Sequence, residues 1–289
     1  MNISFILLLS CLFACVNGET NVVPSEGGCV ANGRFEIPVG DHFVKIAEEK
    51  GAWLTVGDNT ELIIDGDIHL EGNGLRSCDI IRVTGNNVLI HGKGSIVGDR
   101  SSHEGDEGEW GMGIRLHNAT DVTVKGLTIA DCWGDCVYIG GNCERIKIDS
   151  CLLCGSRRQG ISITKADGVT VTDCRIADIS GTMPQYAIDI EPNLRCVVDH
   201  VLIQNVTVEN CEGGFRAILG KKAVGNARIG HVEVIGCQVM AKSRHTLQFA
   251  GCEEATVKNC TIETRRDDKP IIFKHGNNLI KENNKVIYR

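Results

Sequence analysis

A pattern of strand-forming residues returns along the chain at nearly constant intervals. Residues 122–129 align with 146–153 and with 169–176, at steps of 24 (122 to 146) and 23 (146 to 169) residues. Three later copies begin at Val201, Val232 and Ala255. No helical pattern separates the copies, and one coil of this length cannot bury its own apolar face. The coils must therefore stack on one another, which predicts a β-solenoid.

A second series of short apolar segments keeps step with the first. It consists of residues 113–116, 136–139, 160–163 and 187–190. Leucine-rich repeats have a similar period, but this chain lacks their Leu/Asn consensus. Aromatic residues make up only 4% of the chain and Gly occurs 34 times, which favours many short strands joined by turns. We therefore expect an all-β fold, a right-handed parallel β-helix over residues 61–289, with residues 19–60 as a short N-terminal cap.

The first 18 residues have the features of a secretory signal peptide. Residues 3–16 form a hydrophobic run that is shorter than the roughly 20 residues of a membrane span. A cleavage site is acceptable at residues 16–18, and no later segment reads as a transmembrane span. Residues 12–15 also resemble an imperfect bacterial lipobox, so lipid attachment at Cys15 is the alternative. We expect a secreted protein.

The charge of the chain limits its partners. The formal net charge is −7, which argues against nucleic acid or an anionic membrane surface as the partner. An anionic polysaccharide remains compatible with this charge if a local group of arginines binds it. The sequence does not indicate an oligomeric state.

Cysteines recur at one position of the repeat. Cys151, Cys174, Cys237 and Cys260 take the same place as Leu127 and Val206. Because free Cys behaves as a small buried hydrophobe, we expect a ladder of unpaired cysteines inside a corner of the coil, rather than disulfides or a metal site. No Cys/His set has zinc-finger spacing. Local disulfides stay open for four further cysteines, Cys132, Cys136, Cys143 and Cys154.

Polar side chains should line one face of the solenoid, because residues of a strand point alternately inward and outward. The outward column of the second series is Arg115, Tyr138, Ser162, Asp189, Arg216 and Gln248. The turns before these strands add Asp131, Trp133, Asp135, Arg157, Arg158, Gln159 and Tyr186. The turns after them add His117, Lys165, Glu191 and Asn193. A face that mixes carboxylates, guanidinium groups and aromatic rings suits a sugar chain.

Two carboxylates on this face have a spacing that fits glycoside hydrolysis. Asp135 and Asp189 should lie two coils apart, or ~9–10 Å. Inverting glycosidases separate their acid and base by roughly 6.5–9.5 Å, whereas retaining enzymes need about 5 Å. We expect Asp135 and Asp189 to share the acid and base roles, with Asp131 and Glu191 as further catalytic candidates. A hydrolase of this kind needs no cofactor.

A lyase is the alternative chemistry. A lyase must neutralise the carboxylate of its substrate, either with arginines or with Ca²⁺ held on protein carboxylates. The Ca²⁺ ligands would then come from Asp131, Asp135, Asp189 and Glu191.

Two segments carry a resemblance to a known family. Residues 133–139 (WGDCVYI) and 159–163 (QGISI) resemble the polygalacturonase-like branch, glycoside hydrolase family 28, of the pectate-lyase-like β-helix superfamily. Residues 88–99 resemble an early coil of that family, and the likeness extends over roughly residues 60–265. The family shows Gly-Asp-Asp-Cys-Val-x-Ile and then Gly-His-Gly-Ile-Ser on the next coil.

The resemblance implies a catalytic role for Asp135, which matches the second Asp of the family's pair. Gly134 stands in place of the first Asp, and Gln159 in place of the His. The family's Arg-x-Lys substrate clamp has no clear counterpart, and Arg157, Arg158 and Arg216 are the candidates for its role.

The sequence therefore predicts an exported, polysaccharide-degrading enzyme, an inverting glycoside hydrolase or a lyase, that acts on a uronate-containing glycan. Arg157 and Arg158 would bind the anionic group, while Trp133 or Tyr138 would stack on a sugar ring. Further substrate contacts would come from Gln159, Tyr186 and Arg216. The alternative from a different functional class is a non-catalytic, glycan-binding or adhesive β-helix.

Overall fold

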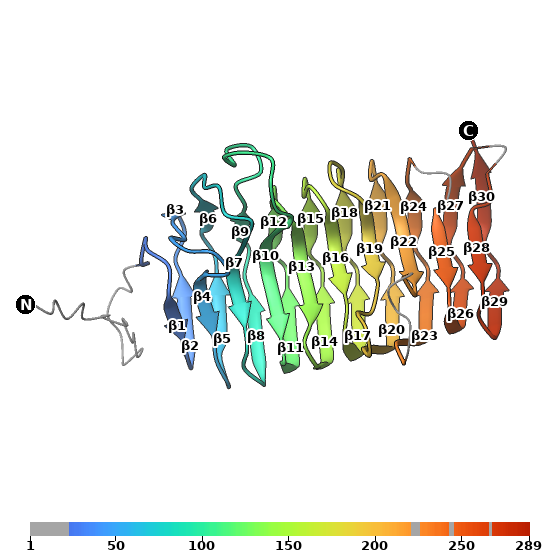
Figure 1. Cartoon of the computed structure of the whole chain (residues 1–289), viewed down its shortest axis with the longest axis horizontal. Coiled ribbons are helices and arrows are strands. Elements are labelled where there is room, and N and C mark those ends of the chain that lie inside the picture. Colours follow the sequence, from blue (N-terminus) through green and yellow to red (C-terminus); the bar gives the residue numbers. More distant parts are fainter. Residues whose placement is uncertain (1–22, 221–225, 243–245, 266–267) are drawn as a thin grey trace, which may run out of the picture.

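The computed structural model describes residues 23–220, 226–242, 246–265 and 268–289. Its strands form three parallel sheets of ten strands each, which run side by side along the long axis of the molecule (Figure 1). The expected all-β, right-handed parallel β-helix is confirmed. Nothing in these described ranges forms a helix that could cross a membrane. The expected signal peptide (1–18) and Cys15 lie outside the described residues.

The chain visits the three sheets in turn, so that every third strand belongs to the same sheet. Sheet 1 contains β1 (Cys29–Ala31), β4 (Ala52–Val56), β7 (Ser77–Val83), β10 (Trp110–His117), β13 (Asp135–Gly140), β16 (Gln159–Ile163), β19 (Tyr186–Ile190), β22 (Gly213–Ile218), β25 (Leu247–Ala250) and β28 (Ile271–Lys274). Sheet 2 contains β2 (Arg34–Ile37), β5 (Glu61–Ile64), β8 (Val88–His91), β11 (Thr120–Lys125), β14 (Cys143–Asp149), β17 (Ala166–Thr172), β20 (Val197–Gln204), β23 (Arg228–Ile235), β26 (Cys252–Lys258) and β29 (Asn278–Glu282). Sheet 3 contains β3 (Asp41–Val44), β6 (Asp67–Leu70), β9 (Ser95–Val97), β12 (Thr128–Ala130), β15 (Leu152–Cys154), β18 (Arg175–Ala177), β21 (Thr207–Glu209), β24 (Gln238–Met240), β27 (Thr261–Thr264) and β30 (Lys285–Tyr288).

The sequence repeat sets the register of sheet 2. Val122 of β11 pairs with Ile146 of β14, and Ile146 pairs with Val169 of β17. The three later copies continue the same column in the predicted order. All of these positions are buried, because an identical phase in every coil places each apolar side chain on the one below it. The predicted alignment of the copies is confirmed.

The sheets begin earlier than the expected boundary at residue 61. Strands β1 to β4 pair with the following coils in all three sheets. Phe35, Ile37, Val44 and Trp53 are buried in the same core as the later coils. The solenoid therefore starts within the region that the sequence predicts to be only a cap. Its strands there are only three to five residues long, too short to show the repeat clearly.

The expected cysteine ladder forms at the corner between sheets 2 and 3. Cys151, Cys174, Cys237 and Cys260 are all buried, in line with Leu127 and Val206. The thiol of Cys174 donates to the Ile148 carbonyl of the preceding coil at 3.7 Å. The four cysteines for which local disulfides stayed open, Cys132, Cys136, Cys143 and Cys154, are free thiols.

Candidate functional site

The predicted polar column lies on the outer face of sheet 1. Arg115 of β10 pairs with Tyr138 of β13, which pairs with Ser162 of β16. Asp189 of β19 and Arg216 of β22 continue the column, and Gln248 of β25 follows them. The order expected from the sequence is confirmed. Side chains separated by more than 130 residues in sequence (115 to 248) therefore form one row along the molecule.

A second row on the same strands carries Asp135 and Gln159, which are direct neighbours in register. Tyr186 and Gly213 continue along the same edge of the sheet. A Cβ atom on Gly213 would lie 2.4 Å from a ring carbon of Tyr186, so only glycine lets this ring lie against the next coil. Tyr186 is 9% exposed. Its ring thus packs into the structure and is not a free sugar platform.

Asp135 lies at the centre of a polar cluster, which we define as Asp135, Arg158, Gln159, Ser162, Asp189, Glu191 and Arg216. The hydroxyl of Ser162 donates to Oδ2 of Asp135 at 2.7 Å. Nη1 of Arg158 donates to both carboxylate oxygens of Asp135, at 3.2 and 3.0 Å. Burial raises the pKa of Asp135, while Arg158 and Ser162 act in the opposite direction. Asp135 is 0% exposed, so substrate cannot touch it in this arrangement.

Asp189 is the carboxyl group whose environment best suits proton transfer. Burial raises the pKa of Asp189 to about 7, with Arg216 opposing the shift and Glu191 adding to it. Its Oδ1 atom is buried and has no hydrogen-bond partner. A carboxyl group with a pKa near neutral is suited to act as a general acid or base at physiological pH.

Glu191 lies beside Asp189 and is more accessible. Nη1 of Arg216 is 3.5 Å from Oδ2 of Asp189, and its Nη2 is 3.6 Å from Oε1 of Glu191. The Glu191 amide donates to the Ile163 carbonyl at 3.1 Å, which extends the strand pairing by one residue. Asp189 and Glu191 are two residues apart, so they point to the same side with backbones ~6.6 Å apart. The Glu191 side chain is 37% exposed.

The structure contradicts the predicted stacking role of Trp133. The His103 ring stacks on Trp133 with centroids 3.8 Å apart, and the Arg157 guanidinium lies 3.7 Å above the Trp133 ring. The indole Nε1 donates to the Glu107 carbonyl at 3.2 Å. Trp133 is 7% exposed. Residues 98–109, which connect β9 to β10, cover it and leave no ring surface for a sugar.

Arg157 is also committed to this connection and not to an anionic ligand. Its Nη1 donates to the Gly108 carbonyl at 2.8 Å and its Nη2 to the Asp106 carbonyl at 3.3 Å. Burial lowers the pKa of Arg157. With Trp133 below it and two carbonyls in front of it, Arg157 holds residues 98–109 in place. The expectation that Arg157 binds substrate is wrong for this arrangement.

Asp131 does not join the other predicted catalytic carboxylates. It occupies the turn between β12 and β13 with φ 51°, and its amide donates to the Cys154 carbonyl at 3.0 Å. Its carboxylate lies against Gly155 of the next coil, where an added Cβ would be 2.2 Å from Oδ1. Asp131 therefore belongs to the corner beside sheet 3, because its left-handed backbone conformation turns it away from the face of sheet 1.

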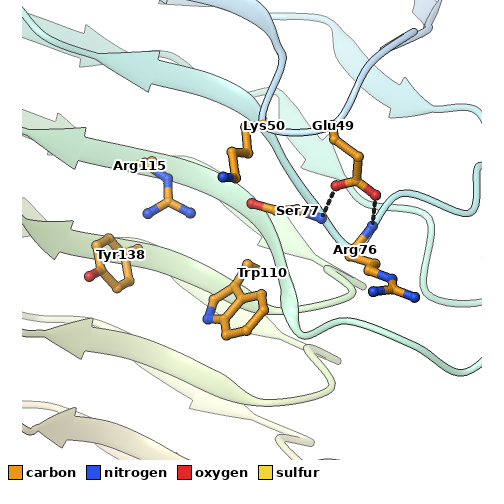
Figure 2. A pocket seen from close by; sticks show the side chains of 7 residues that line it. All are labelled: Glu49, Lys50, Arg76, Ser77, Trp110, Arg115 and Tyr138. Carbon is orange, nitrogen blue, oxygen red and sulfur yellow. Dashed lines mark hydrogen bonds between the residues drawn. The ribbon is translucent and has the colours of Figure 1, made fainter.

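A groove adjoins the polar cluster on the same face of the molecule. It has a volume of about 680 Å³, and Figure 2 shows the side chains that line it. Trp110 is 45% exposed, and the Arg115 guanidinium lies 4.5 Å from the centre of the Tyr138 ring. The complete lining is Glu49, Lys50, Arg76, Ser77, Trp110, Arg115 and Tyr138. Tyr138 pairs in register with Ser162 of the polar cluster, so the cluster begins on the coil next to the groove.

Arg115, one of two arginines in the groove, is held by a buried carboxylate. Asp79 is 1% exposed and accepts from Nε of Arg115 at 2.7 Å and from Nε of Arg82 at 2.7 Å. The Arg82 side chain also donates to the Lys50 carbonyl at 2.6 Å. A fixed guanidinium is well suited to recognise a carboxylate or a hydroxyl, because little side-chain entropy remains to be lost.

Sequence reasoning missed most residues of the groove. Glu49 and Lys50 lie in the region taken for a cap, so their position next to β10 could not be inferred. Trp110 had a usable signal, since it is one of only three tryptophans and follows an acidic, Gly-rich segment just before a predicted strand. The buried Asp79 gave no such signal in the sequence, because a single Asp in a strand is usually an outward, solvated residue.

The four predicted acids do not form a calcium cage. Calcium takes six to eight oxygen ligands. Asp131 lies apart from the others, while Asp135 and Asp189 face the guanidinium groups of Arg158 and Arg216. A cation here would meet these positive charges, so the arrangement does not suit calcium.

The sequence matches curated relatives over part of their length. It is 29% identical over 168 residues to the SPbeta prophage-derived uncharacterized protein YorA of Bacillus subtilis, covering 50% of this chain and 28% of YorA. It is 34% identical over 143 residues to the uncharacterized protein YclG of the same organism, covering 43% of this chain and 24% of YclG. The chain thus spans about a quarter of the length of these relatives.

Solved structures with the same fold have low sequence identity. PfbA, a surface adhesin of Streptococcus pneumoniae, has a TM-score of 0.64 at 11% identity, covering 89% of this chain and 70% of PfbA. The pectate lyase Pel9A has a TM-score of 0.53 at 10% identity, covering 86% and 68%. The tailspike of E. coli bacteriophage HK620, solved with a pentasaccharide, has a TM-score of 0.53 at 12% identity, covering 89% and 56%.

A family model described as the right-handed beta helix region matches residues 62–226, more than half of the chain. The match begins at β5 and runs through β22, across the coils that carry the polar column. On this match and on the three parallel sheets, the chain belongs to the right-handed β-helix family.

Proposed function

We propose that this chain binds a uronate-containing polysaccharide along the outer face of sheet 1 and hydrolyses it with inversion. The groove offers Trp110 as a stacking surface, and Arg115 and Lys50 as cations for the uronate carboxylates. A row of side chains along the molecule suits a chain-like ligand better than a small molecule. The names of the structural neighbours, a pectate lyase and a tailspike with bound pentasaccharide, support a glycan as ligand.

The observation that carries this proposal is the state of Asp189. A pKa of about 7 lets Asp189 hold a proton at neutral pH. Asp189 is 3% exposed and its unpartnered Oδ1 is buried, so the site has to open on substrate binding before this proton can be given. Asp189 would protonate the glycosidic oxygen of the leaving sugar. This assigns the general acid to Asp189 and leaves Asp135 as a buried support that orients Arg158.

Glu191 is the general base of this mechanism. It would take a proton from the water that attacks the anomeric carbon from the other side of the sugar ring. Inverting glycosidases hold their two carboxyl groups roughly 6.5–9.5 Å apart, and side chains that start ~6.6 Å apart on one strand can reach that separation. Arg216 contacts both carboxyl groups and would orient them.

The same proposal includes export and a link to the polygalacturonase-like branch. Export rests on the signal-peptide features of residues 1–18, and the branch rests on the segments around Asp135 and Gln159. The names of two neighbours, a surface adhesin and a tailspike, agree with action outside the cell.

A second candidate is glycan binding without cleavage. It is favoured by Asp135, which is fully buried, paired with Arg158 and hydrogen-bonded by Ser162, so the residue that the resemblance makes catalytic cannot reach a substrate. Under this candidate the groove recognises a sugar chain, and the polar cluster serves only to hold the coils together.

Product analysis on a panel of uronate-containing polysaccharides tests the proposal. New reducing ends without an unsaturated product are expected for the wild type, with a loss of at least a hundredfold in Asp189→Asn and Glu191→Gln. Glu36→Gln, an exposed change on sheet 2, is the control. An unsaturated product would show that the chain is a lyase and not a hydrolase. Binding by all variants without cleavage by any would leave the second candidate.

A further inference from the structure

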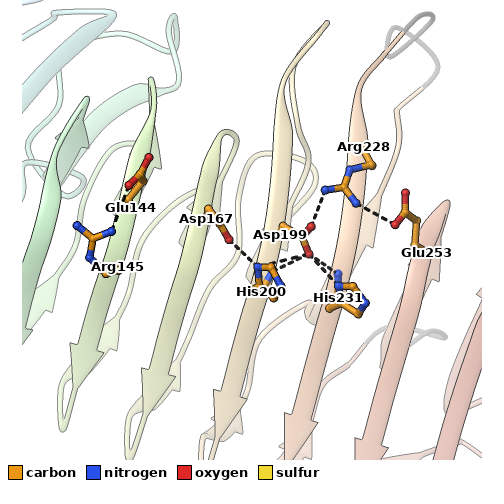
Figure 3. A network of polar contacts seen from close by, with 8 residues as sticks. All are labelled: Glu144, Arg145, Asp167, Asp199, His200, Arg228, His231 and Glu253. Carbon is orange, nitrogen blue, oxygen red and sulfur yellow. Dashed lines mark hydrogen bonds and ion pairs between the residues drawn. The ribbon is translucent and has the colours of Figure 1, made fainter.

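Two histidines lie side by side on the outer face of sheet 2, away from the groove. His200 of β20 and His231 of β23 have ring centroids 5.4 Å apart and ring planes at 12° (Figure 3). Their neighbours Val201 and Val232 pair in register, so the parallel strands place the two rings on adjacent coils. The proposed hydrolysis on sheet 1 uses neither residue.

A carboxylate holds one nitrogen of each ring. Nδ1 of His200 lies 2.7 Å from Oδ1 of Asp167, and Nδ1 of His231 lies 3.1 Å from Oδ1 of Asp199. Because an ionised carboxylate only accepts hydrogen bonds, each Nδ1 carries the proton, and Nε2 of the neutral ring presents a lone pair. Metal-binding histidines in proteins have the same arrangement, with a carboxylate fixing the tautomer and raising the basicity of the ligating nitrogen.

Asp199 places a carboxylate beneath the rings, and Nη2 of Arg228 donates to its Oδ2 at 2.5 Å. The amides of His200 and His231 donate to Oδ1 of Asp199 at 2.9 and 2.8 Å. One potential ligand atom from each of these three residues lies within 4.8 Å of the other two. The backbone amides of the two strands therefore hold Asp199 next to both histidines.

A hollow lies against the same histidines. It has a volume of about 170 Å³, with Glu233, Glu254 and Thr256 on its other side. Glu254 of β26 pairs in register with His231, so it stands on the next coil and lines the same hollow. Two imidazoles and two carboxylates thus border a space large enough for a hydrated ion.

We propose that His200 and His231, with Glu254 as the third ligand, bind a divalent transition-metal ion of the zinc, copper and nickel group. Imidazole nitrogen suits these ions, whereas calcium and magnesium prefer oxygen ligands. Zinc accepts histidine nitrogen and carboxylate oxygen at about 2.0–2.2 Å and leaves a fourth position for water. A bound ion links β20, β23 and β26, and so stabilises three successive coils.

Calorimetric titration of the full chain with Zn²⁺ alone tests the proposal. The wild type should bind one ion, and His200→Gln and His231→Gln should each weaken binding at least tenfold. The double variant should bind no zinc, and Glu254→Gln should weaken zinc binding less than either histidine variant does. The histidine side chains are 64% and 48% exposed, so neither change disturbs the core, and circular dichroism checks this.

His91→Gln is the matched control. His91 also lies on the outer face of sheet 2 and contacts a carboxylate, with Nε2 3.1 Å from Oε1 of Glu61. The His91→Gln variant should bind zinc with the affinity of the wild type. Zinc should also raise the unfolding temperature of the wild type and of His91→Gln, but not that of the double variant.

Two results would overturn the proposal. The first is zinc binding by the double variant with wild-type affinity and stoichiometry. The second is independent of any variant. If Co²⁺ added to the wild type shows a thiolate charge-transfer band, the ion is bound by cysteines and not by the histidine pair.

Discussion

Gln159 donates a hydrogen bond from its Nε2 to Oδ2 of Asp189 over 3.0 Å, from one coil of sheet 1 to the next. Its Oε1 accepts from the Tyr186 amide at 2.8 Å, which fixes the orientation of the Gln159 side chain. Gln159 stands where the resembling family has a His, but an amide has no proton to transfer near neutral pH. The residue therefore orients the Asp189 carboxyl, and the acid chemistry must come from Asp189 itself.

Replacing Gln159 with Leu should destabilise the fold. The change leaves Oδ2 of Asp189 and the Tyr186 amide short of a partner in a buried place, and each such group costs about 1–3 kcal/mol. The free energy of unfolding in urea should fall by about 2–4 kcal/mol. Gln248→Leu, further along the polar column and partly exposed, is the control and should change it by less than about 0.5 kcal/mol. Equal effects of the two changes would contradict this role of Gln159.

Asp189→Asn should alter how stability depends on pH. The pKa of Asp189 is about 7 in the folded chain, whereas an unfolded Asp has a pKa of about 3.9. The folded state therefore holds this proton more tightly, and the stability that results is complete below about pH 4 and lost as the pH rises to 7. Asn cannot ionise, so the stability of the Asp189→Asn variant does not fall in this way as the pH rises.

The difference in unfolding free energy between the two proteins should thus move in favour of Asp189→Asn by up to ~4 kcal/mol between pH 4 and pH 8. Urea unfolding at several pH values measures this shift. A difference that stays constant over this range would show that Asp189 has an ordinary pKa.

Trp110→Ala should weaken glycan binding. Trp110 is 45% exposed at the groove, and a truncated aromatic anchor in a binding site costs roughly 2 kcal/mol, or more than tenfold in the dissociation constant. Tyr288→Ala is the control, since Tyr288 is 54% exposed on sheet 3, away from the groove. Titration with oligosaccharides followed by calorimetry measures both. If both variants bind like the wild type, the groove is not the binding surface.

Arg157→Ala should release residues 98–109 from Trp133. The guanidinium bonds to two carbonyls of this segment and covers the indole, so its loss removes two of the hydrogen bonds that attach the segment to the solenoid. Amide hydrogen exchange within 98–109 should become at least tenfold faster, while exchange in sheet 2 stays the same. Arg145→Ala, which removes an exposed ion pair with Asp121, should leave this segment unchanged. Unaltered exchange in Arg157→Ala would mean that other contacts hold the segment.

The sequence predicts the solenoid well because a repeated phase has only one way to bury its apolar face. Val122, Ile146 and Val169 stack in the predicted order for this reason. The outward column follows from the same alternation, so the rows that contain Tyr138 and Asp189 could be assigned without a structure. The coil before residue 61 was missed because its strands are too short to show the period.

The candidate site was predicted only in part. Asp135, Arg158, Asp189, Glu191 and Arg216 do come together, because strand register determines where each is placed. The other predicted contacts depend on segments that follow no period. The connection 98–109 covers Trp133 and captures Arg157, and a left-handed turn takes Asp131 to another corner.

The sequence alone determined the coil, its register and the face on which the polar residues lie, because these depend on the alternation and period of nearby residues. Only the tertiary structure decided which of those residues are accessible. It buried Asp135 beneath Arg158, raised the pKa of Asp189 by burial, and brought Lys50 next to Trp110 and His200 next to His231. Burial and contact between distant coils depend on how the irregular connections pack, and no repeat encodes that.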